Sequence, residues 1–379
     1  MNKQIALAAL AAVALAACSE NGGMTMSPRS AASLAARLTA DAAADGSGPG
    51  AVYALTNQTS GNAVAVFSRA ADGTLAAAGS AATGGTGTGS GLGSQGALAL
   101  SDDGRWLFAV NAGSNEVSAF RVGPAGLSLT SLAGSGGTRP IGLTVHGSLL
   151  YVLNAGGDGN ISGFSVGPDG ALAAIPGASR ALSGAGVGPA QVAFSPDGLW
   201  LIVTEKTTNL LDVYAVGPDG VVTGRTSYAS AGGTPFGFAF GHRDELFVSE
   251  AVGSASSYVL GVSGGVAAVS GAVATHQGAP CWLVVTKDGR FAYTANAQGA
   301  SISGFAVGVD GSIELLDPTG LTASVNRGNT DLALSVNSRY LYQLDGSSIF
   351  GFRVQADGHL APAGTVVGLP AGTVGLAAH

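Results

Sequence analysis

The chain has 379 residues and a formal net charge of −7 at pH 7, and only 10% of its residues are charged. This sparse, negative charge balance lacks the basic footprint of a nucleic-acid-binding protein, so no nucleic-acid partner is expected. The five histidines and two cysteines show no metal-ligand spacing, and neither a metal nor a cofactor is expected.

The first 18 residues are typical of an export signal. Lys3 supplies a positive charge, and residues 5–17 form an apolar run of 13 residues, too short to span a bilayer as a mature helix. The run closes on Leu15-Ala16-Ala17-Cys18, which resembles the lipobox of bacterial lipoproteins. That resemblance implies that Cys18 is acylated and becomes the mature N-terminus, so that only a lipid anchor joins the protein to a membrane. The alternative is an ordinary secretory signal with a chance cysteine.

Residues 19–49 are rich in alanine, serine, glycine and aspartate and contain few large apolar side chains. Such a segment cannot bury enough surface to offset the entropy lost on ordering, so a flexible tether is expected. Ser19, and not an aspartate, follows Cys18, which is similar to the pattern of Gram-negative lipoproteins sorted to the outer membrane. These features predict a lipid-anchored protein of the bacterial cell envelope, on the periplasmic side or at the surface.

The rest of the chain is organised around a repeated unit that is clearest at residues 190–220. Three runs rich in β-forming residues, at 191–194, 199–204 and 211–216, alternate with turn sequences such as Pro196-Asp197-Gly198. Turns at this spacing reverse the chain, so the unit is predicted to be an antiparallel meander. A fourth strand is expected directly afterwards.

The unit recurs along residues 50–379, and its second strand ends each time in a polar residue. These residues follow one another at a mean interval of 48 and are Asn57, Asn111, Asn154, Glu205, Glu250, Asn296 and Asp345. Four strands in such a period predict an all-β, seven-bladed β-propeller of four-stranded antiparallel blades, a single domain whose core is spread between blades. The C-terminal run 374–379 matches the first strand of a blade. It is therefore expected to pair into the N-terminal blade and close the ring.

The repeat elements of residues 50–379, among them S-P-D-G, L-x-V-x-N/E and D-G-x-L, resemble those of the seven-bladed lactonase family. That family includes the propeller-type 6-phosphogluconolactonases and the fungal carboxymuconate-lactonising enzymes. The resemblance implies an active site at the mouth of the central channel, built from a histidine, two arginines and a glutamate. The arginines would hold an anionic substrate and stabilise an oxyanion, while the histidine or glutamate would move protons.

One of these four family positions keeps its residue in this chain. Glu205 matches the family glutamate and is the candidate catalytic base. Ile141 stands at the position of the histidine, and Ala190 and Cys281 stand at those of the two arginines. The alternative for Glu205 is structural, because polar residues at the equivalent places of other blades commonly cap a hairpin.

Further candidates follow from where the strands are expected to run. Arg139 is one residue out of register with the family pattern and could reach the same mouth. Three residues just inside first strands are predicted to face the channel or its rim as substrate-binding residues: Gln191, Trp282 and Asp331. His276 and Arg327 lie in loops that could border the opening.

The remaining motifs have structural interpretations. Gly91-x-Gly93-x-x-Gly96 matches a dinucleotide fingerprint but leads into a strand, so it offers no helix N-terminus to a phosphate. Trp106 and Trp200 begin second strands at matching places, which favours packing between blades. Cys281 is interpreted as a buried small apolar residue.

Two functions remain open. The first is a lactonase-like hydrolase acting on a small acidic lactone, with Glu205 as the base. The second is a non-catalytic lipoprotein whose propeller binds a sugar, a peptide or an envelope protein. The family resemblance favours the first function and the missing family residues favour the second. A small lactone or sugar-like molecule is the expected ligand, and the protein is expected to be a monomer.

Overall fold

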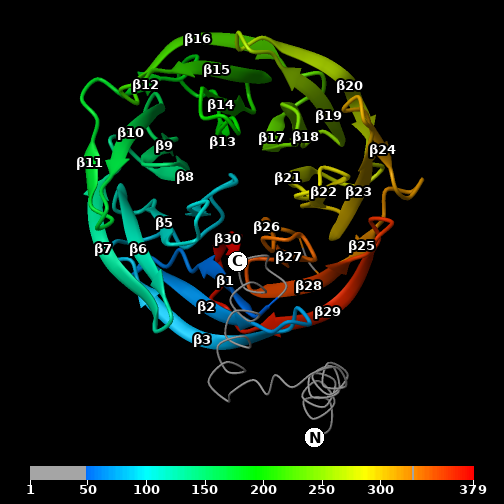
Figure 1. The fold of residues 1–379 in the computed structure, drawn as a ribbon, viewed down its shortest axis with the longest axis horizontal. Helices are drawn as coiled ribbons and strands as arrows, with labels where there is room; N and C mark the ends of the chain where they lie inside the picture. The colour runs from blue at the N-terminus through cyan, green and yellow to red at the C-terminus, as the bar shows by residue number, and fades with distance from the viewer. Residues whose placement is uncertain (1–47, 327) are drawn as a thin grey trace, which may run out of the picture. The chain divides into compact units, whose positions relative to one another are not determined.

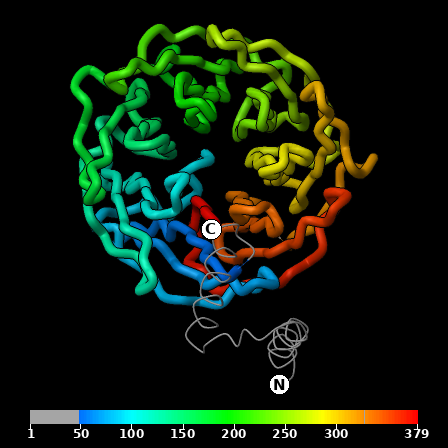
Figure 2. The backbone as a smooth tube through the Cα atoms, viewed as in Figure 1, coloured from blue at the N-terminus to red at the C-terminus, as the bar shows by residue number. Residues whose placement is uncertain are grey.

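The computed structural model describes residues 48–326 and 328–379. These residues form seven antiparallel β-sheets arranged as blades of a ring (Figures 1 and 2), which confirms the predicted all-β, seven-bladed propeller. This part of the chain contains no helix, and hence no helix able to cross a membrane. The predicted signal sequence with Cys18, nearly all of the predicted tether at 19–49 and Arg327 lie outside the described residues.

Each blade has four strands in order from the axis outward, or five where the outer strand is broken in two. Blade 1 contains β30 (Val374–Ala378), β1 (Gly50–Leu55), β2 (Ala63–Arg69) and β3 (Leu75–Ala82). Blade 2 contains β4 (Leu98–Leu100), β5 (Trp106–Asn111), β6 (Glu116–Gly123) and β7 (Gly126–Gly134). Blade 3 contains β8 (Pro140–His146), β9 (Leu149–Asn154), β10 (Asn160–Val166), β11 (Leu172–Ala174) and β12 (Arg180–Ala181).

The other four blades continue in the same order. Blade 4 contains β13 (Pro189–Phe194), β14 (Trp200–Glu205), β15 (Leu210–Val216) and β16 (Val222–Ala229). Blade 5 contains β17 (Pro235–Phe240), β18 (Glu245–Glu250), β19 (Ser254–Leu260) and β20 (Val266–Ala274). Blade 6 contains β21 (Pro280–Val285), β22 (Phe291–Asn296), β23 (Ser301–Val307), β24 (Ile313–Leu315) and β25 (Ala323–Ser324). Blade 7 contains β26 (Asp331–Leu334), β27 (Tyr340–Leu344), β28 (Ser348–Val354) and β29 (Leu360–Val367).

Local turn chemistry reverses the chain between strands. Between β13 and β14, the carboxylate of Asp197 accepts hydrogen bonds from Leu199 N (3.0 Å) and the Ser195 hydroxyl (2.5 Å). Gly198 follows at φ 72°, a backbone conformation that residues with a Cβ rarely adopt. The S-P-D-G sequence therefore builds the hairpin from its own atoms, which is why the repeat could be recognised from sequence.

The ring is closed by its two ends. β30 pairs antiparallel with β1, with Val52 opposite Ala378 and Ala54 opposite Leu376. Arg69 Nε also donates a hydrogen bond to the carbonyl oxygen of His379 (3.1 Å). Blade 1 thus takes its innermost strand from the C-terminus and its other three strands from the start of the propeller, which confirms the predicted closure.

Neighbouring blades pack where a turn glycine of one blade meets a large side chain of the preceding blade. A Cβ on Gly170 would lie 2.3 Å from the Trp106 ring, and a Cβ on Gly264 would lie 2.4 Å from the Trp200 ring. The Tyr151 hydroxyl donates to the carbonyl of the turn residue Gly220 in the next blade (2.7 Å). Both tryptophans therefore pack between blades, as predicted.

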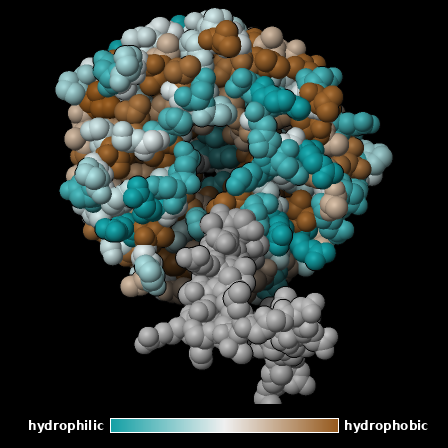
Figure 3. Space-filling model, in the orientation of Figure 1, coloured by the Kyte–Doolittle hydropathy of each residue, from teal (hydrophilic) through white to brown (hydrophobic). Residues whose placement is uncertain are grey.

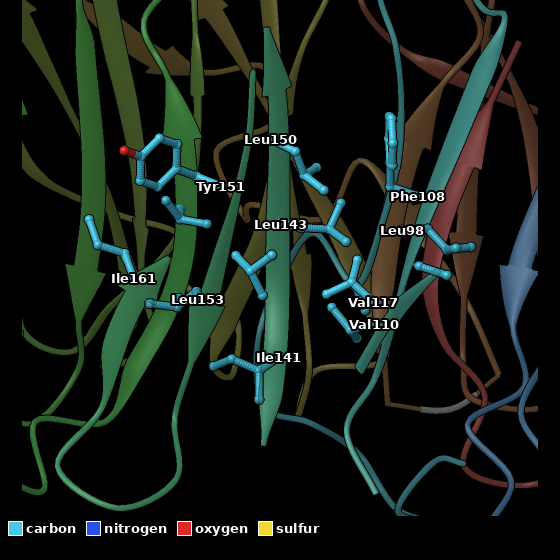
Figure 4. Packing of buried hydrophobic residues seen from close by; sticks show 14 of the residues in the cluster. Leu98, Phe108, Val110, Val117, Ile141, Leu143, Leu150, Tyr151, Leu153 and Ile161 are labelled. Carbon is cyan, nitrogen blue, oxygen red and sulfur yellow. The ribbon is translucent and has the colours of Figure 1, made fainter. Parts of the chain in front are cut away.

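The apolar core is distributed around the ring. One cluster of buried residues joins blades 1 to 4, and a second joins blades 4 to 7. Figure 4 shows Phe108 and Val117 of blade 2 in one layer with Leu143 and Leu150 of blade 3. Each blade is therefore stabilised mainly by burial against its neighbours, as in other repeat architectures.

Candidate functional site

The face of the ring where β8, β13, β17 and β21 begin is here called the mouth face. Each of these strands begins with a proline, and the residue before it is left-handed, with φ of 53° at Arg139, 62° at Gly188, 61° at Thr234 and 53° at Ala279. In this conformation the carbonyl of Arg139 accepts a hydrogen bond from Ala155 N (3.0 Å), and that of Gly188 accepts one from Lys206 N (3.0 Å). The backbone of the repeat thus fixes the positions of the Cα atoms of Arg139 and Lys206, from which their side chains extend.

Glu205 ends β14, and its side chain is fully buried. Its carboxylate accepts hydrogen bonds from Ser183 N (2.9 Å), from the Ser183 hydroxyl and from Thr208 Oγ1 (2.7 Å). Asp212 is a near neighbour, and burial together with the charge of Glu205 raises the pKa of Asp212. The Glu205 carboxylate therefore ties the loop before β13 to the turn after β14.

The polar ends of other second strands make the same kind of contact. Glu250 accepts hydrogen bonds from Gly232 N (2.7 Å) and Ser254 Oγ (2.6 Å). Asn154 donates from Nδ2 to the carbonyl of Ser135 (3.2 Å). This recurrence supports the capping interpretation of Glu205, and its role as a catalytic base stays a prediction.

A pocket of about 270 Å³ lies at the mouth face between blades 3 and 4 and is here called the mouth pocket. Arg139, Asp158 and Lys206 line it together with the apolar Leu92 and Ile141. Arg139 is exposed, and none of the described acidic residues forms an ion pair with it. Its guanidinium is therefore able to hold a carboxylate or phosphate in this pocket.

Lys206 is the second cation of the mouth pocket. Its Nζ lies 5.0 Å from the centre of the Phe236 ring and donates a hydrogen bond to the carbonyl of Gly93. Burial lowers the pKa of Lys206 to about 8, and the positive charge of Arg139 acts in the same direction. A fraction of this amine is therefore neutral slightly above neutral pH, as a general base requires.

Residues 90–96 form a segment that enters the centre of the ring (Figures 1 and 2) and is here called the axial segment. Gln95 N donates to the carbonyl of Ala190 (3.0 Å), while its side chain donates to Leu283 O (2.8 Å) and accepts from Leu283 N (2.9 Å). Gly96 O accepts a hydrogen bond from Leu143 N (2.8 Å). The segment thus contacts the inner strands of blades 3, 4 and 6, and β4 is short because the chain before it turns towards the axis.

The axial segment fits because two inner strands carry glycine beside it. A Cβ on Gly142 would lie 2.9 Å from Gln95 O, and a Cβ on Gly237 would lie 2.0 Å from Gln95 Oε1. The view in Figure 3 shows the ring hollowed at its centre, with hydrophilic residues around much of the hollow. The polar backbone of residues 90–96 is therefore part of the surface that any axial ligand would meet.

Gln191 and Trp282 reach the axis, but their polar groups already bind the backbone. Gln191 Nε2 donates to Phe238 O (3.0 Å) and its Oε1 accepts from Phe238 N (2.7 Å). Trp282 Nε1 donates to Ser94 O in the axial segment (2.9 Å). Neither side chain lines the mouth pocket, and both hold the centre of the ring together.

Asp331 is also buried at the axis. Its Oδ2 accepts a hydrogen bond from Leu376 N of the closing strand (2.9 Å), and its Oδ1 accepts one from Leu332 N (2.8 Å). Burial raises the pKa of Asp331 to about 8, because the ionised carboxylate is poorly solvated there. Together with Gln95 and Gln191, Asp331 lines a separate cavity of about 220 Å³ deeper in the ring.

The mouth pocket therefore gathers Arg139 with Lys206 and leaves Glu205, Gln191, Trp282 and Asp331 outside its lining. Sequence reasoning missed Lys206 and the axial segment. One signal pointed to the segment, because the interval from Asn57 to Asn111, 54 residues, is the longest in the repeat and contains the glycine-rich run 84–96.

Cys281, at a family arginine position, is buried, and burial raises the pKa of its thiol to about 12. The exposed His276 does not line the mouth pocket. Within residues 48–326 and 328–379, no group of three or more His, Cys, Asp or Glu side chains could hold a metal ion.

Comparisons with known proteins agree with this architecture. Residues 51–177 match the family model described as "Lactonase, 7-bladed beta-propeller". The matched residues span blades 1 and 2 and most of blade 3. Among curated protein sequences, no match to the chain was found.

Many solved structures are similar to this seven-bladed propeller, and two of them are described here. A candidate 6-phosphogluconolactonase of Bacteroides fragilis has a TM-score of 0.69 at 19% sequence identity, covering 86% of this chain and 97% of that one. The periplasmic gluconolactonase of Pseudomonas aeruginosa also has a TM-score of 0.69 at 19% identity, covering 86% of this chain and 98% of that one. At this identity the likeness shows the fold, and an activity has to be argued from the site.

Proposed function

We propose that the protein hydrolyses a small acidic lactone and that the mouth pocket is its active site. The observation that carries this proposal is the convergence of Arg139 and Lys206 in one pocket at the mouth face of a propeller whose residues 51–177 match a lactonase family model. A volume of about 270 Å³ suits a ligand of the size of a sugar acid. The names of these two structures, a candidate 6-phosphogluconolactonase and a gluconolactonase, support that substrate class.

In this proposal Arg139 and Lys206 have different roles. Arg139 binds the carboxylate or phosphate of the substrate through its planar guanidinium. The neutral amine of Lys206 takes a proton from a water molecule, whose oxygen adds to the lactone carbonyl carbon. The ring C–O bond then breaks, Lys206 returns the proton to the leaving oxygen, and the product is an open-chain hydroxy acid.

Glu205 is the competing base. It stands at the place of the family glutamate, directly before Lys206 in the chain. To act on a water it would have to exchange its hydrogen bonds to Ser183 and Thr208 for that water. Because those bonds hold the loop before β13 against the turn after β14, Lys206 is preferred here.

A second candidate function is non-catalytic binding of a sugar-like or acidic ligand. It is favoured by the buried, fully engaged carboxylate of Glu205. It is also favoured by Ile141, Ala190 and Cys281 at the other three family positions. In that case the mouth pocket would bind its ligand through Arg139 and leave it unchanged.

A lactone-hydrolysis assay separates these functions. Proton release is measured for the full-length chain with a panel of sugar-acid lactones. Arg139→Gly keeps the left-handed backbone, as Gly188 does in blade 4, and is expected to raise KM roughly tenfold, the loss of one charge-assisted contact. Arg121→Gln, on the exposed side of β6, is the control and should behave as wild type. Absence of hydrolysis, with ligand binding that Arg139→Gly weakens, would select the binding function.

We also propose that the protein works as a monomer at the bacterial cell envelope, held there by acylated Cys18. The support is the lipobox-like sequence of residues 15–18 and the likeness to a periplasmic gluconolactonase. Metabolic labelling with a fatty acid tests the anchor. Label should enter the wild-type chain and be lost in Cys18→Ser, and labelling of neither would reject the lipoprotein assignment.

A further inference from the structure

A second charged groove lies between blades 6 and 7, on the face opposite the mouth, where β21 and β26 end in hairpin loops. It has a volume of about 550 Å³ and adjoins a smaller one of about 380 Å³. The exposed cations along the two are Lys287, Arg290, Arg339 and Arg353. Four cations along these two adjoining grooves are a marked concentration in a chain with 16 lysines and arginines and a net charge of −7.

The hairpin loop that forms this groove also occurs in blade 2, where its arginine is neutralised. In blade 2, Arg105 Nε lies 2.5 Å from Asp103 Oδ2 of the same loop. In blade 6 the corresponding pair, Arg290 and Asp288, is looser at 3.9 Å. In blade 7 the loop reads Ser-Val-Asn-Ser-Arg, so an asparagine takes the place of that aspartate and the loop contains no carboxylate for its arginine.

Asn337, the substituted residue, keeps the turn intact. Its Oδ1 accepts hydrogen bonds from Arg339 N (3.1 Å) and Ser335 Oγ (3.1 Å), as an aspartate there would. Its Nδ2 is buried and has no hydrogen-bond partner among the described residues. A buried donor without a partner is costly unless a water or a ligand meets it. The exchange therefore removes a negative charge from the groove and leaves a buried, unsatisfied N–H donor beneath its surface.

We propose that this groove binds a phosphate-bearing ligand, with Lys287 and Arg339 as its cationic contacts. A phosphate group has three acceptor oxygens and up to two negative charges, so it can bind both side chains at once. Arg290 is partly engaged, because Nη2 donates to Ala356 O (3.0 Å) and the guanidinium lies 4.9 Å from the Phe291 ring. The site is independent of the mouth pocket and of any lactonase activity.

The test uses Asn337→Asp, which the fold tolerates because aspartate holds this place in blades 2, 4 and 6 as Asp103, Asp197 and Asp288. The full-length chain is titrated at low salt with inorganic pyrophosphate by calorimetry. In a parallel arm, it is sedimented with phosphatidylglycerol vesicles. Asn337→Asp is expected to weaken binding roughly tenfold, because the new carboxylate neutralises Arg339 and repels phosphate. The matched exchange Asp103→Asn, in blade 2, should leave the affinity unchanged.

The outcomes separate the sources of the phosphate. Pyrophosphate binding that Asn337→Asp weakens supports a soluble phosphate ligand. Binding to vesicles alone, equally sensitive to Asn337→Asp, supports a lipid headgroup. The proposal is overturned if neither probe binds, if Asn337→Asp leaves binding unchanged, or if Asp103→Asn alters it as much.

Discussion

The side chain of Gln95 occupies the space that any side chain at Gly237 would need: its amide oxygen lies 2.0 Å from the point where a Cβ on Gly237 would be. Gln95 uses that space to bond both backbone groups of Leu283. The glycine in blade 5 and the glutamine in the axial segment are therefore one structural unit, although they are far apart in the sequence.

Gly237→Ala should displace Gln95 from the axis. The N–H and carbonyl of Leu283 would lose their partners, so we expect a loss of about 2 kcal/mol in the free energy of unfolding, measured in urea. Gly134→Ala is the control, because a Cβ there meets nothing within 4 Å. Equal stability of the two variants would contradict the role assigned to Gln95.

Removing residues 372–379 should leave the propeller unfolded or aggregated. The deletion removes β30 and exposes the paired edge of β1, which would then be free to pair with other chains. Size-exclusion chromatography and thermal unfolding measure the effect. A synthetic peptide of residues 372–379, added in trans, should restore the monomer by strand addition. A truncated chain that unfolds cooperatively at the wild-type temperature would show that closure is dispensable.

Asp331 should make stability depend on pH. Its pKa is raised to about 8 in the folded protein, whereas an aspartate in an unfolded chain titrates near 4. Between these values the folded protein holds a proton that the unfolded chain lacks. Stability therefore falls as pH rises from about 4 to about 8, on the order of 1 kcal/mol per pH unit, and then levels off.

Asp331→Asn removes this titration and keeps an acceptor for Leu376 N. Urea unfolding between pH 5 and 8 should show a shallower pH slope in the variant and a gain in stability at pH 8. Asp310→Asn, at an exposed turn, is the control, because the pKa of Asp310 is lowered and its titration lies below this range. The same slope in wild type and Asp331→Asn would argue against a protonated Asp331.

The lowered pKa of Lys206 predicts how the rate of lactone hydrolysis should depend on pH. Because the neutral amine is the proposed base, kcat/KM should rise with pH and level off above an apparent pKa near 8. Lys206→Gln should lower kcat by about 10²-fold and remove this rise. A profile that is unchanged in the variant would exclude Lys206 as the base, after correction for spontaneous hydrolysis.

The Glu205→Gln variant tests whether Glu205 is a structural cap or the catalytic base. A glutamine cannot accept from Ser183 and Thr208 as a carboxylate does, so we expect a loss of about 1–3 kcal/mol in stability. Glu250→Gln removes the equivalent carboxylate of blade 5 and should cost a similar amount. If both variants hydrolyse lactones at the wild-type rate, Glu205 is structural. A loss of kcat confined to Glu205→Gln would restore it as the base.

The blades could be predicted from sequence because their signals are local. Asp197 and Gly198 build a turn from their own atoms, and the polar ends of second strands repeat the contact made by Glu205 and Glu250. Ring closure followed from counting strands, because the last run of the chain lacked a partner.

The centre of the ring could not be predicted in the same way. Gln95 forms hydrogen bonds with Leu283, 188 residues away, through a space left by a glycine. Nothing in the sequence around the glutamine or the glycine indicates such a contact. At the mouth, Glu205 and Lys206 are adjacent in sequence but take opposite roles, one buried in the blade and one lining the pocket. Which of two neighbouring polar residues reaches an opening depends on packing that the repeat pattern does not encode.

The origin of blade 1 also sets an order of events during synthesis. Its outer three strands are made first among the propeller strands, yet its innermost strand, β30, is made last. Blade 1 therefore lacks its innermost strand until the other six blades have been synthesised. The circle can therefore close only after the strands of all seven blades have been synthesised.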